Sequence, residues 1–187
     1  MNRIDKTVLG LAGEYAVASE LCRRGFFAQI TYGRWKNTDI IAVNPAKGKT
    51  VLIEVKSKQG AEWPSINGIR GQNRFQVLVD YERVIQGHQK RPDFYILDES
   101  FWNKYVDRMI RECRKKDPNA KVTRKDNEKI ILFKEKQRMR EIRIKYEDDR
   151  IVFEWPSGNK KYFGVNLKPS DVKSRLEQWD LIIKALS

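Results

Sequence analysis

Cysteine and histidine are scarce in this chain of 187 residues. It has two cysteines, Cys22 and Cys113, and one histidine, His88. The two cysteines lie far apart in apolar patterns typical of helices, so we expect buried, reduced thiols and no disulfide framework. A zinc site made of His and Cys needs several such residues at close spacing, and the sequence does not offer them. His88 lies in a stretch rich in Gly, Gln and Lys, and we interpret it as an ordinary loop residue.

Long apolar runs are also absent. No stretch approaches the roughly 20 apolar residues that a membrane span needs. The first residues lead into an amphipathic pattern and not into the continuous apolar run of a signal peptide. The chain has no internal repeat and no low-complexity linker. We therefore expect a cytoplasmic protein that forms one domain, or one domain with an appendage.

Charge, in contrast, is abundant and unbalanced. The chain has 38 Lys and Arg residues against 25 Asp and Glu, a net charge of +13, and its isoelectric point is near 9.8. This excess favours a polyanionic partner, and nucleic acid is the first candidate. Residues 101–150 hold 17 Lys or Arg and 10 Asp or Glu, more than half of the excess. They form either a solvated, salt-bridged face or a surface that follows a phosphate backbone.

Residues 5–24 are predicted to form an amphipathic helix. Its apolar residues recur at intervals of three and four and form the stripe Val8, Leu11, Ala12, Tyr15, Ala18, Leu21 and Cys22. Asp5 fits an N-cap and Gly25 a C-terminal cap. Gly13 lies mid-helix, where glycine costs about 0.5–1 kcal/mol relative to alanine. A close approach of the helix backbone to a neighbour would account for this glycine.

Several strands follow this helix. They are predicted over residues 26–32, 38–43, 51–56 and 94–97, with the second and third forming a hairpin. Residues 75–80 fit a strand, but a helix over 74–86 fits the same apolar spacing. The segment 57–73 contains three glycines, a proline and a tryptophan. We interpret it as a structured loop that could close over a substrate.

The pattern changes towards the C-terminus. A helix is predicted from Asp98 or Ser100 to about residue 116. Residues 120–166 alternate charged and apolar residues, which predicts antiparallel hairpins. A closing helix is expected from Pro169, with the apolar stripe Val172, Leu176, Trp179, Ile183 and Leu186. We divide the chain into a core of residues 1–118 and an extension of residues 119–187 packed on it as one compact domain. A dimer surface, a DNA clamp and a second small core stay open as roles for the hairpins.

Charged residues interrupt the predicted hairpin of residues 38–56. Asp39 opens its first strand, and Glu54 and Lys56 lie in its second. Residues two apart share a strand face, so Glu54 and Lys56 point to one side and Ile53 and Val55 to the other. If Asp39 lies across from Glu54, two carboxylates and an ammonium converge, and a hard divalent ion such as Mg²⁺ would relieve their repulsion. Taken alone, such a triplet is also common on the wet face of a strand.

Together these segments resemble the PD-(D/E)XK nuclease superfamily. The likeness rests on Gly13-Glu14 in the first helix, on the strand that begins Thr38-Asp39, and on Glu54-Val55-Lys56 in the next strand. The run is most similar to Holliday-junction resolvases and restriction-endonuclease-like proteins. It covers about residues 8–60, and residues 61–100 loosely. Thr38 stands where the motif name has proline, a position that varies in the superfamily. The resemblance implies a restriction-endonuclease-like α/β (mixed α+β) core around a mixed central sheet.

The resemblance also implies an activity, which is metal-dependent hydrolysis of DNA phosphodiester bonds. Asp39 and Glu54 would hold Mg²⁺, or Mn²⁺ as a substitute, with the Val55 carbonyl as a further ligand. Lys56 would position the attacking water or help to deprotonate it. Glu14 would reach the site directly or through a water molecule. The metal would polarise the phosphate and generate a nucleophile near neutral pH.

Candidates for substrate contact lie beside this cluster. They are Arg34, Trp35, Lys58 and Gln59. We expect nucleic acid, specifically DNA, as the partner, and no membrane. By analogy with the family, a homodimer is one option. Two other interpretations stay open: an inactive nucleic-acid-binding or partner-binding module on the same fold, and an unrelated α+β protein whose charges decorate its surface.

Overall fold

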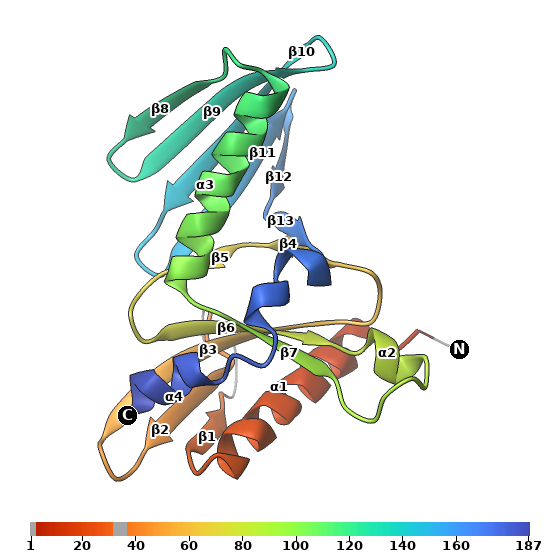
Figure 1. The fold of residues 1–187 in the computed structure, drawn as a ribbon, viewed down its shortest axis with the longest axis vertical. Coiled ribbons are helices and arrows are strands. Elements are labelled where there is room, and N and C mark those ends of the chain that lie inside the picture. Colours follow the sequence, from red (N-terminus) through yellow and green to blue (C-terminus); the bar gives the residue numbers. More distant parts are fainter. Residues whose placement is uncertain (1–2, 32–36) are drawn as a thin grey trace. The chain divides into compact units, whose positions relative to one another are not determined.

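The computed structural model describes residues 3–31 and 37–187, which form two compact units (Figure 1). Unit 1 consists of Met1–Trp63, Gln72–Asp98 and Leu167–Ser187, and unit 2 of Pro64–Gly71 and Glu99–Asn166. Each unit has its own sheet. The chain therefore leaves unit 1 twice and returns to it twice.

Unit 1 is an α+β unit built on a five-stranded mixed sheet. Its elements are α1 (Lys6–Arg23), β1 (Phe27–Ile30), β2 (Ile40–Asn44), β3 (Lys49–Lys58), β6 (Arg74–Asp80), α2 (Glu82–Ile85), β7 (Asp93–Leu97), the 3₁₀ helices η1 (Pro169–Asp171) and η2 (Lys173–Arg175), and α4 (Asp180–Leu186). The strand order is β1-β2-β3-β6-β7, in which only β3 and β6 run parallel. The expected mixed sheet and its strands are confirmed. Residues 75–80 form a strand, and the alternative helix over 74–86 is wrong.

Helices α1 and α4 pack on one face of this sheet. The buried core joins Val17 of α1, Ile53 of β3 and Ile182 of α4, all of which are inaccessible to solvent. Gly13 brings α1 so close to β3 that a Cβ at this position would lie 1.9 Å from the Oγ of Ser57. The expected close approach at Gly13 is thus confirmed, and it draws the first half of α1 onto β3.

The buried side of α1 differs from the predicted stripe. Three residues of that stripe are 46–61% exposed: Val8, Leu11 and Tyr15. Cys22 is exposed too, so the prediction of a core thiol is wrong there, whereas Cys113 is buried as expected. Apolar residues occur on more than one side of this helix, and periodicity alone does not select among them. The contact of Gly13 with β3 makes the selection.

The C-terminal segment returns to unit 1, but not as one helix. Leu176 is extended, with φ −60° and ψ 124°, and Glu177 has a φ of 54°. The chain therefore breaks before α4, and Ile182 is buried in place of the predicted Ile183. The predicted domain boundary at residue 118 is corrected as well. The first unit boundary after β7 lies between Asp98 and Glu99, and residues 167–187 belong to unit 1.

Unit 2 consists of one long helix and an antiparallel sheet. Its elements are β5 (Gly68–Ile69), α3 (Glu99–Lys116), β8 (Lys121–Lys125), β9 (Glu128–Glu135), β10 (Arg138–Tyr146), β11 (Arg150–Ser157) and β12 (Lys160–Phe163). The strand order is β12-β11-β10-β9-β8, and β5 pairs with β11. The strands β4 (Trp63–Ile66) and β13 (Val165–Leu167) form a separate two-stranded sheet. The predicted hairpins over 120–166 are confirmed, whereas the predicted loop over 57–73 contains the end of β3 together with β4 and β5.

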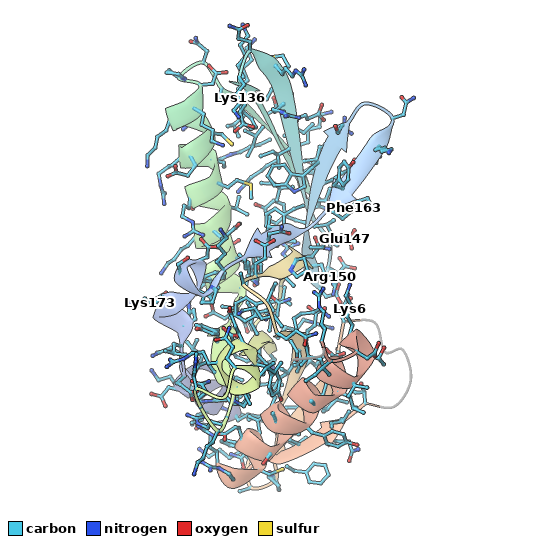
Figure 2. The ribbon with its side chains drawn as sticks, turned by 90° about the vertical axis from the view of Figure 1, so that its right-hand side faces the viewer. Lys6, Lys136, Glu147, Arg150, Phe163 and Lys173 are labelled. Carbon is cyan, nitrogen blue, oxygen red and sulfur yellow. The ribbon has the colours of Figure 1, made fainter. Side chains whose placement is uncertain are left out.

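Helix α3 packs along one face of the unit 2 sheet (Figure 1). The rings of Trp102 on α3 and Phe153 on β11 lie 5.8 Å apart between centroids, and both side chains are buried. Figure 2 shows Lys136, in the turn between β9 and β10, at the opposite end of this sheet from Glu147 and Arg150. In the described parts of the chain, no helix has the length and apolarity that a membrane crossing requires.

Candidate active site

Asp39 is held against β3 at two points. Its N–H donates to the carbonyl of Ile53 at 2.9 Å, and its carboxylate accepts from the N–H of Val55 at 2.7 Å. These contacts flank Glu54, so Asp39 lies alongside that residue. β2 begins one residue later, with Ile40 paired to Ile53. Asp39 thus lies just before β2. Its carboxylate accepts the main-chain N–H of Val55, which lies beyond the pair of Ile40 and Ile53.

Glu54 is a buried charge, and both of its oxygens are engaged. Its side chain is 3% exposed, and Oε1 lies 3.0 Å from the Nζ of Lys56. Oε2 accepts a hydrogen bond from the Nε2 of Gln76 at 2.8 Å. A buried carboxylate is costly unless it is both paired and hydrogen-bonded, and these two partners meet that need. The side chain of Lys56 is 42% exposed, so its amino group faces solvent as well as Glu54.

Glu14 joins this cluster from α1. Partial burial raises the pKa of Glu14 above its ordinary value, the charge of Asp39 raises it further, and the charge of Lys56 lowers it. Charges act on a pKa in this way only over short distances, so Glu14 lies near both residues. The tight contact of Gly13 with β3 brings its neighbour Glu14 to this place. All four predicted catalytic residues, including Glu54, therefore lie in one region of unit 1.

The oxygen atoms of this region suit a hard divalent cation. Asp39 and Glu54 provide carboxylates, and the carbonyl of Val55 lies in the same strand segment. Mg²⁺ is usually held by only one or two carboxylates together with water and substrate phosphates. Among residues 3–31 and 37–187, no three His, Cys, Asp or Glu side chains are grouped as a metal site. The residues fit a cation that is completed by water and substrate, and not one enclosed by protein.

The amino group of Lys58, a predicted substrate contact, bonds to other groups of the protein. Its Nζ lies 2.7 Å from Asp80 and 3.1 Å from Glu82, and its side chain is 2% exposed. The same nitrogen donates to the carbonyl of Gly60 at 2.7 Å and lies 4.8 Å from the ring centroid of Trp63. An ammonium has three N–H donors, and three oxygen atoms surround this one. These contacts occupy all three donors of Lys58, which leaves none for the predicted contact with substrate.

The other predicted substrate contacts divide into two kinds. The side-chain amide of Gln59 exchanges hydrogen bonds of 2.9 and 2.7 Å with the main chain of Ile4, which ties the segment before α1 to the end of β3. Its observed partner is thus this segment of the protein. Arg34 and Trp35 lie outside the residues that the structure describes.

Gln76 is the residue that sequence reasoning missed. It lies on β6 opposite Glu54 in the parallel register of β3 and β6, and it is 1% exposed. The signal in the sequence was an amide inside the otherwise apolar run Phe75–Val79. A buried amide needs partners, and the carboxylate of Glu54 is one of them. Gln76 therefore orients Glu54.

Comparison with known proteins assigns no family to this chain. No protein-family model, no curated protein and no solved structure matches it.

Proposed function

We propose that the protein is a metal-dependent nuclease that hydrolyses phosphodiester bonds of DNA. The observation that carries this proposal is the position of Asp39 alongside Glu54, with the amino group of Lys56 at 3.0 Å from Glu54. Two carboxylates and a lysine are the groups that a divalent cation and a scissile phosphate need. The net charge of +13 supports a polyanionic substrate. The proposal assigns unit 1 to the PD-(D/E)XK superfamily, with a restriction-endonuclease-like topology.

The residues of the cluster have separate roles in this proposal. A bound Mg²⁺ would supply Lewis-acid polarisation of the phosphate and activation of a water molecule. Asp39 and Glu54 would hold the ion through oxygen atoms, and Gln76 keeps Glu54 in position through its hydrogen bond. Lys56 orients the attacking water and stabilises the negative charge that develops on the phosphate. Glu14 adds a carboxylate that can accept a hydrogen bond from that water.

A cleavage assay tests this proposal. Plasmid, linear duplex, a four-way junction and single-stranded DNA are incubated with the protein in Mg²⁺, Mn²⁺ or chelator. We expect cleavage only with metal, abolished in Asp39→Asn and reduced on the order of 10²–10⁴-fold in Lys56→Ala. Asn at position 39 can still accept the N–H of Val55, so the fold should persist.

The chain offers a matched control for Lys56. Lys145 in unit 2 is 40% exposed and also pairs with a buried glutamate, Glu154, at 2.7 Å. Lys145→Ala should cut like the wild type. If the wild type binds DNA in a salt-dependent way but does not cut it in either Mg²⁺ or Mn²⁺, the nuclease proposal is wrong. A binding module on the same fold then replaces it.

A further inference from the structure

Unit 2 has a groove rich in arginine between α3 and β8. Its volume is about 430 Å³, and its lining residues are Asp107, Ile110, Arg111, Arg114, Val122 and Arg124. Three of these six residues are arginines, and one is acidic. The walls of the groove therefore carry an excess of two positive charges.

The local structure explains why the arginines meet there. Arg111 and Arg114 are three residues apart on α3, so they lie on the same side of the helix. On β8, Val122 pairs with the buried Ile131 of β9, and Arg124 lies two residues further on the same face of the strand. β8 is the edge strand of the sheet (Figure 1). The groove is thus bounded by a helix on one side and a sheet edge on the other.

Nearby carboxylates balance the groove arginines only in part. Asp107 lines the groove, and the hydrogen bond from Lys115 and then the charges of Arg108 and Arg111 lower the pKa of Glu112. Throughout the described parts of the chain, none of the guanidinium groups of Arg111, Arg114 and Arg124 forms an ion pair. The next two residues of α3 differ, since Lys115 pairs with Glu112 at 2.8 Å and Lys116 with Glu135 at 2.6 Å. The helix dipole favours a cation in the last turn and so accounts for Arg114. It does not account for Arg111 or for Arg124 on the strand.

We propose that this groove binds the phosphodiester backbone of a nucleic acid strand. The guanidinium group donates paired hydrogen bonds to phosphate oxygens, and a concave site strengthens the field that attracts a polyanion. The apolar lining consists of Ile110 and Val122, with no aromatic side chain on which a base could stack. Contact with the backbone positions a nucleic acid without selecting its sequence. This inference rests on the proposed function for the identity of the polyanion, but it concerns a separate site.

Binding measured without metal tests the groove independently of cleavage. Fluorescence anisotropy of labelled duplex and single-stranded oligonucleotides is followed in chelator, at several salt concentrations, with the full chain. In the variant Arg111→Gln/Arg114→Gln/Arg124→Gln, we expect the dissociation constant to rise roughly tenfold or more. The slope of log affinity against log salt should fall by about 0.9 for each arginine that contacts a duplex phosphate.

A charge-matched control separates the groove from overall charge. Lys104, Arg138 and Lys160 are exposed cations of unit 2 that do not line the groove. Changing all three to Gln removes the same net charge and should alter affinity and salt slope far less. Asp107→Asn should tighten binding, because it removes a carboxylate that repels phosphate. If the triple groove variant does not fold, Arg124→Gln on the edge strand is measured in its place. We expect about a third of the change in the slope of log affinity against log salt.

The outcomes distinguish this inference from the proposed function. Equal losses in the groove variant and its control would overturn the groove as a site. If the wild type cuts DNA while the groove variant binds like its control, only the groove inference fails. If the wild type does not cut with any metal, and binding is lost selectively in the groove variant, the nuclease proposal fails and the groove stands.

Discussion

Glu54 in unit 1 and Glu154 in unit 2 are both buried, and each pairs with a lysine. The side chains of Glu54 and Glu154 are 3% and 2% exposed. Glu54 lies 3.0 Å from Lys56, and Glu154 lies 2.7 Å from Lys145, with both lysines about 40% exposed. The second partners differ, because Glu154 has another lysine, Lys161, at 3.1 Å. The second oxygen of Glu54 accepts a hydrogen bond from the neutral amide of Gln76.

The balance of charge differs between the two clusters. The hydrogen bond from Lys145 holds the pKa of Glu154 below its ordinary value, and two lysines more than neutralise this one carboxylate. Beside the pair of Glu54 and Lys56, Asp39 lies alongside Glu54, and its charge raises the pKa of partly buried Glu14 further. That excess of negative charge favours a cation from outside, whereas the cluster in unit 2 is complete without one.

The largest expected difference is in cleavage by the two Glu→Gln variants. Glu54→Gln should reduce the rate about 10²-fold or more, because it removes a cation ligand from the proposed site. Glu154→Gln should leave the rate unchanged, since that carboxylate only neutralises lysines. Single-turnover cleavage with Mg²⁺ measures both. Equal rates in the two variants would contradict the distinction between the clusters.

Lys56 and Lys58, both on β3, extend the comparison to stability. Lys58→Ala should lower the free energy of unfolding by about 3–5 kcal/mol, because it leaves Asp80 buried without its cation. Lys56→Ala should cost less, about 1–3 kcal/mol, because the amino group of Lys56 is partly in water and Gln76 still donates to the buried carboxylate of Glu54. Asp80 also acts on Tyr95, since burial, followed by the charge of Asp80, raises the pKa of Tyr95 to about 12. Urea denaturation measures both variants, and equal losses would show that Lys56 is structural too.

Gln76→Met tests whether the amide of Gln76 only stabilises buried Glu54 or also positions it for a cation. Removing the amide leaves one buried carboxylate oxygen without this donor, which should cost about 1–3 kcal/mol in unfolding free energy. If Gln76 also positions Glu54 for a cation, about 10–100-fold more Mg²⁺ should be needed for half-maximal cleavage. A purely structural role would lower stability and leave the Mg²⁺ dependence unchanged.

The smallest expected effect concerns Glu14 and pH. Burial raises the pKa of Glu14 above its ordinary value of 4.5. Below pH 4.5 the carboxyl is protonated in the folded and unfolded chains alike. As pH rises, the unfolded chain releases this proton first, so the folded chain loses stability until pH passes the raised pKa. Glu14→Gln should therefore be more stable than the wild type at pH 7, and the advantage should vanish below pH 4.5. Thermal unfolding from pH 4 to 8 measures this, and a constant difference would rule it out.

Patterns along the chain predicted much of the local structure. Asp5 caps α1, as expected, because its carboxylate accepts N–H groups only two and three residues away. The alternation of apolar and polar residues predicted β3 and the hairpins of unit 2, since a strand presents successive side chains to opposite faces. The same alternation placed Glu54 and Lys56 on one face of β3. These features depend on neighbours in sequence, and the sequence by itself determined them.

Contacts between distant segments decided the rest. Gln76 meets Glu54 only because β3 and β6 pair in parallel, a register that no local pattern encodes. Lys58 continues the face of Lys56, yet the packing of β6 and of residues 60–63 buries one lysine and leaves the other partly exposed. Several sides of α1 carry apolar residues, and only the contact of Gly13 with β3 selects which side is buried. Burial and pairing depend on which segments meet, and only the tertiary structure decides that.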